Sequence, residues 1–360
     1  MSTARRQLAG RTRRARLRLA ARGPVRTGYP ERVTQTPVAP AAAGQSAGES
    51  SADQPVRTER RLPHAGRSRT AHRTRVGAYI ALTKPRIIEL LLVTTLPSMV
   101  LAAQGLPKWW VALVTMLGGT LAAGSANALN CYLDRDIDAV MRRTGRRPLA
   151  RHEVSPTGAL VFGLLLGAAS VLAIGLATNW LAGSLTFTAI AFYVLVYTAL
   201  LKRRTSQNIV WGGAAGCMPA LIGWSAVTGS LAWAPFALFA VVFFWTPPHT
   251  WALATRYRED YAKAGVPMLP VVASPSRVTA EMVIYTWLTV AASLALWPLA
   301  TSWVYGVLAA GAGAVLIVAA HRLHARTKAD SGAKPMAFFH LSNSYLAFVF
   351  VAVAVDTFVR

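Results

Sequence analysis

Long, uninterrupted runs of apolar residues occupy the chain beyond Tyr79, and short polar segments separate them. Each run has about 18–23 residues, the length of helix that crosses about 30 Å of hydrocarbon. Apolar and polar residues do not alternate within the runs, so the pattern predicts transmembrane helices and not a β-barrel. The nine predicted helices cover residues 87–104, 109–131, 157–177, 180–201, 207–228, 232–254, 279–299, 302–321 and 338–358.

The composition favours a membrane protein over a pair of soluble domains. Of the 360 residues, 54% are hydrophobic and only 14% are charged. A soluble chain of this length buries too little surface to hide so much apolar area. The two cysteines, Cys131 and Cys217, both lie in apolar runs, which argues against a disulfide framework or a cysteine-based metal centre. We therefore predict an all-α integral membrane protein.

Basic residues gather in every second connection between the predicted helices. Of the remaining connections, only the first carries a charge, Lys108. Because cytoplasmic loops are enriched in lysine and arginine, the pattern predicts a cytoplasmic N-terminus and a C-terminus on the other side. The main basic residues of these connections are Arg135, Arg142, Arg143, Arg146, Arg147, Arg151, Lys202, Arg203, Arg204, Arg256, Arg258, Lys263, Arg277, Arg322, Arg326, Lys328 and Lys334.

Residues 1–75 differ sharply from the rest of the chain. Seventeen arginines, no lysine and four acidic residues give them a net charge of +13, and large apolar residues are scarce. We therefore predict a disordered cytoplasmic tail over residues 1–76 and a transmembrane domain over residues 77–360. The charge does not indicate nucleic-acid binding, because no recognition module accompanies it.

Two interpretations of the arginine-rich segment stay open. It lacks the apolar core of a secretory signal, but its composition is also that of an organellar transit peptide. We favour a tail in a multi-pass protein of the bacterial inner membrane. The alternative is a transit peptide of a protein of the mitochondrial inner membrane.

Three oxygen-bearing side chains recur at helical spacing near the end of the second predicted helix. If that helix continues, Asn130, Asp134 and Asp138 stand at i, i+4 and i+8 on one face, and Arg142 extends it. Amide and carboxylate oxygens suit Mg²⁺, and with an arginine they would hold a diphosphate. Alternatively, the acidic residues cap the helix end and pair with arginines, although its dipole disfavours them there. Asp136 points elsewhere and is expected to form a surface ion pair.

A second polar cluster follows the sixth predicted helix, on the same side of the membrane. It contains Arg258, Glu259, Asp260, Tyr261 and Lys263. The two clusters could face each other across a cavity. Exposed salt bridges would account for Glu259 and Asp260 equally well.

Further candidates lie at or near the membrane edge. His249 follows a Pro-Pro pair that is predicted to break or kink its helix, and a histidine at such a depth is a functional candidate. It could instead bond a carbonyl that the prolines leave free. Lys84 and Arg86 open the first helix as interfacial anchors or as ligands of an anion. Lys202 is a topology signal or an anion ligand, and Asn208 lies just inside the fifth helix.

These motifs resemble the UbiA-type intramembrane prenyltransferases. The spacing Asn130-x-x-x-Asp134-x-x-x-Asp138, followed by Arg-Pro-Leu at 147–149, is similar to the first aspartate motif of that family. The resemblance covers residues 77–358, and several segments are similar to the branch that farnesylates haem. Those segments are 79–86, 202–213, 219–224, 260–270 and 342–346.

Two departures distinguish the chain from quinone-making relatives in that family. Cys131 stands where those relatives have an additional aspartate after the motif asparagine. The segment Tyr-Arg-Glu-Asp-Tyr at 257–261 replaces their second run of aspartates. The identity of the metal ligands in the second cluster is left open by this difference, with Asp260 preferred over Glu259.

The resemblance implies a nine-helix UbiA-like bundle and a Mg²⁺-dependent enzyme. It would transfer farnesyl from farnesyl diphosphate to a vinyl group of protohaem IX, with hydration, and pass haem O to a haem O hydroxylase (haem A synthase). Asp134, Asp138 and Arg142 would be catalytic. Because His249 lies beside the second cluster in the sequence, we expect it to ligate the haem iron or bind a propionate, with His340 and His321 as alternatives. The implied metal ligands are Asn130, Asp134, Asp138 and Asp260. The implied substrate-binding residues are Lys84, Arg86, Lys202, Asn208, His249, Arg258, Tyr261 and Lys263.

Two other functions stay open. A UbiA-type enzyme could prenylate an aromatic acid, a naphthoate or a chlorophyllide, although the haem-type segment at 265–270 argues against it. A transporter with an acidic gate is a more distant alternative. Transporters place ionisable residues near the middle of the membrane, whereas both clusters here lie at one face.

Overall fold

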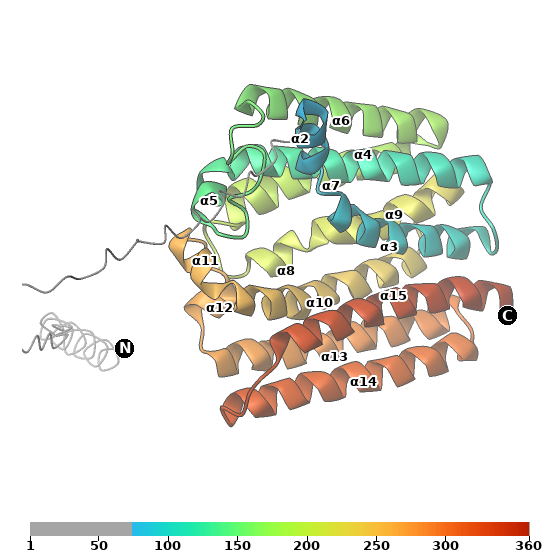
Figure 1. Ribbon diagram of the computed structural model, residues 1–360. Helices are drawn as coiled ribbons and strands as arrows, with labels where there is room; N and C mark the ends of the chain where they lie inside the picture. Colours follow the sequence, from blue (N-terminus) through green and yellow to red (C-terminus); the bar gives the residue numbers. More distant parts are fainter. Residues whose placement is uncertain (1–73, 360) are drawn as a thin grey trace, which may run out of the picture. The chain divides into compact units, whose positions relative to one another are not determined.

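The computed structural model describes residues 74–359, apart from the side chains of residues 86–92, and every regular element in this range is a helix. The all-α prediction is confirmed, while nearly all of the predicted tail lies outside the described residues. Long helices run back and forth beside one another (Figure 1). The elements are α2 (Arg75–Leu82), α3 (Pro85–Ala103), α4 (Trp109–Leu133), α5 (Arg135–Val140), α6 (Pro156–Ala177), α7 (Trp180–Ala191), η1 (Phe192–Leu201), α8 (Asn208–Gly212), α9 (Ala214–Thr228), α10 (Trp233–Arg256), α11 (Arg258–Lys263), α12 (Leu269–Val272), α13 (Pro275–Ala300), α14 (Trp303–Lys328) and α15 (Pro335–Val359).

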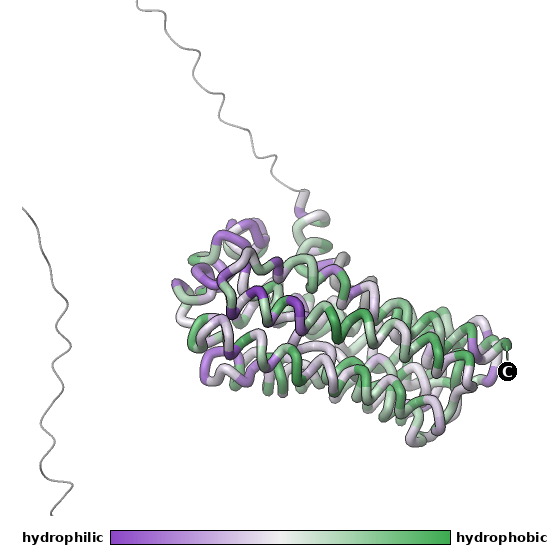
Figure 2. The backbone as a smooth tube through the Cα atoms, turned by 90° about the horizontal axis from the view of Figure 1, so that it is seen from below, coloured by the Kyte–Doolittle hydropathy of each residue, from purple (hydrophilic) through white to green (hydrophobic). Residues whose placement is uncertain are grey.

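Eight helices of the described chain are long and apolar enough to cross a membrane, and each matches a predicted span. In the position of the remaining span stands α3, a helix of 19 residues. Its described side chains from Val93 to Ala103 form a shorter apolar helix. The predicted total of nine depends on α3. Figure 2 shows hydrophobic backbone along most of the length, with hydrophilic segments gathered at one end.

Several helices begin at a polar cap that the sequence places just before a proline or an apolar run. The Ser155 hydroxyl accepts a hydrogen bond from the Gly158 amide at 3.0 Å, and Pro156 follows it as the first helical residue of α6. The Asn179 side chain accepts from the Ala182 amide at 2.9 Å and starts α7. Such caps satisfy amides that have no partner within the helix, and proline costs nothing there because it has no amide hydrogen.

Small residues let α4 and α6 pack closely. The Ser125 hydroxyl donates to the Gly163 carbonyl and the Ser170 hydroxyl to the Gly118 carbonyl, each at 2.7 Å. A methyl group on Gly163 would lie 2.8 Å from the side chain of Leu129. Within a bilayer, apolar contact alone does not favour helix association over lipid contact, so close packing and hydrogen bonds of this kind hold the helices together.

Two local features differ from the expectation of simple helices. The segment η1 is a π-helix that continues α7, and its Thr198 hydroxyl donates to the Tyr193 carbonyl at 2.9 Å. Of the two outcomes predicted at Pro247-Pro248, a break or a kink, the break is wrong, because α10 runs through both prolines. Each proline removes an amide donor and crowds the carbonyl four residues before it, and the packing of α10 against α9, α13 and α15 holds the helix across this point.

Asp356 joins α15 to the start of α14. Its carboxylate is buried and accepts hydrogen bonds from the Ser302 amide at 2.9 Å, from the Ser302 hydroxyl and from the Tyr305 amide at 3.2 Å. These amides belong to the first turn of α14, where a negative charge is favourable. The carboxylate therefore serves as a cap provided by a different helix.

We predict that Asp356→Ala lowers the stability of the protein, because it leaves these buried donors without an acceptor. The expected loss is about 1–3 kcal/mol. Asp356→Asn keeps one acceptor oxygen and should lose less. Thermal unfolding of the two variants in detergent measures the difference, and equal stability of Asp356→Ala and the wild type would contradict the capping role.

Candidate functional site

Three of the predicted ligands lie where α4 meets α5. Helix α4 ends at Leu133, and Asp134 connects it to α5. The helical hydrogen bonds persist across the junction, from the Asp134 amide to the Asn130 carbonyl at 2.9 Å and from the Asp138 amide to the Asp134 carbonyl at 2.8 Å. All three side chains are buried. The predicted i, i+4, i+8 arrangement is therefore present, although the helix is interrupted within it.

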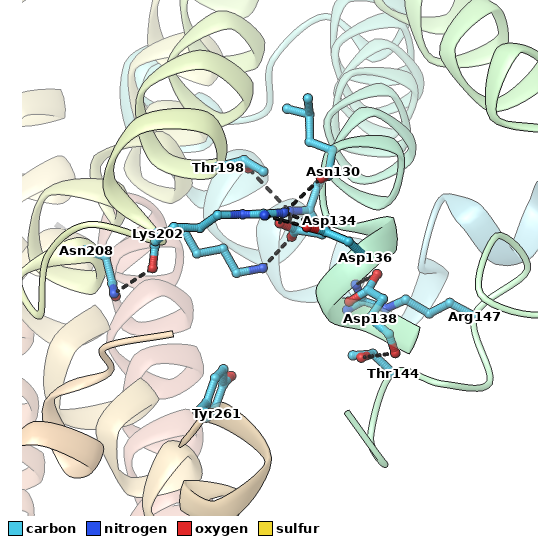
Figure 3. A network of polar contacts seen from close by, with 12 residues as sticks. Asn130, Asp134, Asp136, Asp138, Thr144, Arg147, Thr198, Lys202, Asn208 and Tyr261 are labelled. Atoms are coloured by element: carbon cyan, nitrogen blue, oxygen red, sulfur yellow. Dashed lines mark hydrogen bonds and ion pairs between the residues drawn. The ribbon is translucent and has the colours of Figure 1, made fainter. Parts of the chain in front are cut away.

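Asp134 is the centre of the polar network (Figure 3). Its Oδ2 atom accepts a hydrogen bond from the Asn130 amide group at 2.6 Å and forms an ion pair with Lys202, which follows η1. The Asn130 amide also lies 3.3 Å from the Thr198 hydroxyl. The Oδ1 atom of Asp134 is buried and has no hydrogen-bond donor in the described part of the chain, and its charge partner is the Arg203 guanidinium at 3.8 Å.

Lys84 reaches the network from the turn between α2 and α3. Its backbone is left-handed (φ 52°), and its ammonium donates to Oδ1 of Asn130 at 2.8 Å. The Asn127 side chain fixes the same turn by donating to the Thr83 carbonyl at 2.9 Å. Burial, together with the charges of Arg147 and Lys202, lowers the pKa of Lys84 to about 8. A nearby anion would favour its charged form.

Asp138 pairs with Arg147, while Arg142 lies apart from it. Its carboxylate accepts from the Arg147 guanidinium at 2.6 Å, and the Thr144 hydroxyl donates to its carbonyl at 3.1 Å. Because α5 ends at Val140 and Met141 is extended, Arg142 does not continue the helical face and lies exposed. The prediction that Arg142 shares this face is wrong.

Asp136 forms the surface ion pair that the spacing indicated. The Arg203 guanidinium donates to both of its oxygens at 2.6 Å, and the carboxylate is 60% exposed. The hydrogen bond from Arg203 lowers the pKa of Asp136 to about 2. Asp134 and Asp136 are thus two neighbouring carboxylates in opposite environments.

The second polar cluster meets the first through Arg143. The Arg143 amide donates to the buried carboxylate of Asp260, and its guanidinium donates to the Tyr261 hydroxyl, each at 3.1 Å. Arg258 and Lys263 are exposed. The structure therefore links Asp260 and Tyr261 to the loop that follows the first cluster and gives Arg258 and Lys263 no such contact.

Asn208 and His249 are held in different surroundings. The Asn208 amide donates to the Thr205 carbonyl at 2.7 Å, while its Oδ1 atom is buried without a donor among the described residues. The His249 ring lies between Trp245 and Phe339, with centroids 4.1 and 4.3 Å away, and its Nδ1 atom lies 2.8 Å from the Ser342 hydroxyl. These contacts join α10 to α15, away from both acidic clusters. The side chain of Arg86 lies outside the described residues.

Sequence reasoning assigned four contacting residues too little importance. Arg143, Arg147 and Arg203 were counted among the charges that set topology, and Thr198 was not considered. The three arginines stood in the segments that carry the resemblance, Arg143 and Arg147 after Asp138 and Arg203 within 202–213, so a signal existed for them. Thr198 contacts the site through η1, whose course is not visible in a periodic pattern.

The sequence of the chain is similar to those of known proteins. The profile of the UbiA prenyltransferase family matches residues 91–343. The chain belongs to this family. Two UbiA relatives are protoheme IX farnesyltransferase 1 of Saccharopolyspora erythraea, 60% identical over 289 residues, and protoheme IX farnesyltransferase of Cutibacterium acnes, 56% identical over 299 residues. The matches cover 80% and 82% of this chain and 92% and 89% of those proteins.

Solved structures share the UbiA fold at low sequence identity. A structure of digeranylgeranylglyceryl phosphate synthase has a TM-score of 0.66 at 16% identity, over 79% of this chain and 99% of that one. A UbiA homologue from Archaeoglobus fulgidus, bound to GPP and Mg²⁺, has a TM-score of 0.53 at 18% identity, over 77% and 99%. These likenesses establish the fold, and the UbiA bundle is confirmed for this chain.

Gly212 provides space for an aromatic residue behind the site. A methyl group on Gly212 would lie 2.1 Å from the ring of Tyr197, which precedes Thr198 in η1. Tyr197 also packs against Ile137 of α5 and Ile209 of α8. The absence of a side chain at Gly212 therefore lets η1 approach α8 closely.

We predict that Gly212→Ala destabilises the protein by about 1–3 kcal/mol through overpacking against Tyr197. Gly216→Ala in α9 is the matched control, because its methyl group would meet nothing within 4 Å. This control should be neutral or stabilising by up to about 1 kcal/mol, since alanine favours helix. Thermal unfolding in detergent compares the two, and equal midpoints would show that Tyr197 does not need the space.

Proposed function

We propose that this protein transfers the farnesyl group of farnesyl diphosphate to a vinyl group of protohaem IX, with addition of water, giving haem O and diphosphate. The observation that carries the proposal is the 56–60% identity to proteins named protoheme IX farnesyltransferase over most of both chains. A different acceptor, such as an aromatic acid or a chlorophyllide, would require a different binding surface within the same family.

The site chemistry supports ionisation of an allylic diphosphate. Cleavage of the carbon–oxygen bond leaves the electron pair on the diphosphate, so positive groups around that anion lower the barrier. Lys84, Lys202 and Arg147 already contact Asn130, Asp134 and Asp138, respectively. An incoming diphosphate would exchange these internal partners for its own oxygens. Arg142, Arg258 and Lys263 are exposed and would contribute at longer range.

The oxygen atoms of the site fit a hard divalent cation. Asp134 and Asn208 each present a buried Oδ1 atom without a hydrogen-bond donor among the described residues. Asn130, Asp134 and Asp138 would hold Mg²⁺, with Asp260 from the second cluster. No three acidic, histidine or cysteine side chains of the described chain lie close enough to bind a metal by themselves, so amide and diphosphate oxygens would complete the shell. Mg²⁺ would supply positive charge to the leaving group.

Carbon–carbon bond formation needs no nucleophile from the protein. The vinyl π electrons of protohaem bond to C1 of the farnesyl cation, and water then adds to the cation left on the haem side chain and releases a proton. The pocket must exclude water until the carbon–carbon bond has formed. Asn208, which is buried, and Tyr261, which is half-buried, would line the pocket around the reacting groups.

The protein's setting follows from the same proposal. It spans a membrane several times, and the bacterial relatives support the bacterial inner membrane as its location. With a cytoplasmic N-terminus, the end that carries α5 and α11 faces the cytoplasm, where farnesyl diphosphate is soluble. Haem O would leave through the bilayer toward a haem O hydroxylase.

We predict that Asp134→Asn lowers farnesyl transfer by about a hundredfold or more, because several kcal/mol of leaving-group stabilisation depend on the metal seat. Asp136→Asn is the matched control, since it removes a carboxylate two residues away on the exposed side. Membranes with each variant receive haem b, farnesyl diphosphate and Mg²⁺, and mass spectrometry detects a farnesylated, hydrated haem.

The outcomes of this assay separate the possibilities. Product from the wild type and from Asp136→Asn, but not from a folded Asp134→Asn, agrees with the proposal. Product from all three keeps the reaction and removes Asp134 from an essential role. If the wild type makes no haem product, an acceptor screen with aromatic acids and chlorophyllide decides whether another prenyl transfer is the function.

His249 is the proposed contact to haem. Its Nδ1 atom lies 2.8 Å from the Ser342 hydroxyl, so iron or a propionate would bind through Nε2. We predict that His249→Ala weakens haem binding and changes the haem absorption spectrum. His340→Ala, which removes an exposed histidine of α15, should change neither. Unchanged haem affinity and spectrum in His249→Ala would exclude both roles.

A further inference from the structure

A groove of about 550 Å³ opens between α14 and α15, apart from the polar site. Its floor includes the buried side chains of Leu323 and Phe338, and Val315 and Val318 on its wall are about half exposed. The inner part of the groove is thus apolar and open to the outside of the bundle. On a protein that spans a membrane, such a surface faces lipid.

Three cations gather at one end of this groove. Arg322 and Arg326 stand one helical turn apart on α14, and Lys334 lies just before α15, so two separate elements contribute. All three side chains are exposed, and within residues 74–359 none of them forms an ion pair or a hydrogen bond. Lys328, at the end of the same helix, does not line the groove. Three of the four lysines and arginines of this region, from Arg322 to Lys334, therefore line the groove.

The cations lie at the level where a lipid headgroup would be found. The α14–α15 connection is at the same end of the bundle as α5, α11 and α12 (Figure 1), and hydrophilic segments gather at this end (Figure 2). The apolar wall extends from there along α14 toward Ala314. Charge at the membrane edge and apolar surface below it match a molecule with an anionic head and hydrocarbon tails.

We propose that this groove is a binding site for one anionic phospholipid. Its phosphate would lie among Arg322, Arg326 and Lys334, and an acyl chain would lie against Val315, Val318 and Phe338. Basic pockets between transmembrane helices recognise anionic lipids through this combination. The groove shares no residue with the sites proposed to bind diphosphate and haem, so the lipid proposal does not depend on the proposed reaction.

Native mass spectrometry of the full chain in detergent tests the proposal. The protein is titrated with phosphatidylglycerol and, in parallel, with phosphatidylcholine of the same acyl chains. One molecule of phosphatidylglycerol should bind to each protein, and its affinity should be higher than that of phosphatidylcholine. Arg326→Gln should weaken that binding about fivefold, the expected contribution of one cation near an anionic head. Lys328→Gln is the matched control and should leave it unchanged.

The apolar part is tested separately. Ala314→Trp fills the inner end of the groove without changing its charge and should also weaken phosphatidylglycerol binding. Glycerol 1-phosphate, which has the charge but no tails, should not displace the bound lipid. Size-exclusion chromatography of each variant confirms that the protein remains folded.

Any of the following results would overturn the proposal: equal affinity for the two lipids, equal loss in Arg326→Gln and Lys328→Gln, full retention of binding in Ala314→Trp, or displacement of the lipid by glycerol 1-phosphate. Haemin, a dicarboxylate with a large apolar ring, is added as a competitor. Displacement of the lipid by equimolar haemin, lost in Arg326→Gln, would assign the groove to porphyrin instead of lipid.

Discussion

The buried carboxylate of Asp134 is the constraint on which the hydrophilic end of the bundle, the end that carries α5, depends. A charge without water is stable only where opposite charge and hydrogen-bond donors surround it, and here they come from α4 and from the segment after η1. Meeting that requirement brings Lys202 to the α4–α5 junction. Through Asn130, it also engages Lys84 from the turn before α3. One desolvated carboxylate therefore draws together segments that are distant in the sequence.

The same arrangement suits a site that must accept a highly charged ligand. Asp134 and Asp138 pair with Lys202 and Arg147, so neither buried carboxylate lacks a positive partner. Under the proposed function, a diphosphate would take over these cations. Such an exchange of partners costs less desolvation than the creation of a new ion pair in a dry site.

The sequence was sufficient for the features that follow from periodicity. Apolar runs located the membrane helices, and the i, i+4, i+8 spacing identified Asn130, Asp134 and Asp138 as one buried set. It failed where the backbone leaves regular geometry. Arg142 leaves the helical face because α5 ends at Val140, and the loop that follows brings Arg147 to Asp138 instead. The contact between Arg143 and Asp260 joins residues that are 117 positions apart, a distance at which local pattern carries no information.

The π-helical turn of η1 has a consequence for how this span can vary. Each i→i+5 turn contains more residues than an α-helical one, so the side chains after it are rotated relative to those before it. In this span α7 packs mainly on α6 and α9, while η1 contacts α4 and α8. The packing face and the face that carries Thr198 therefore follow separate registers within one membrane crossing. Removing a single residue between them would preserve the length needed to cross the bilayer and yet turn one face away from its partners.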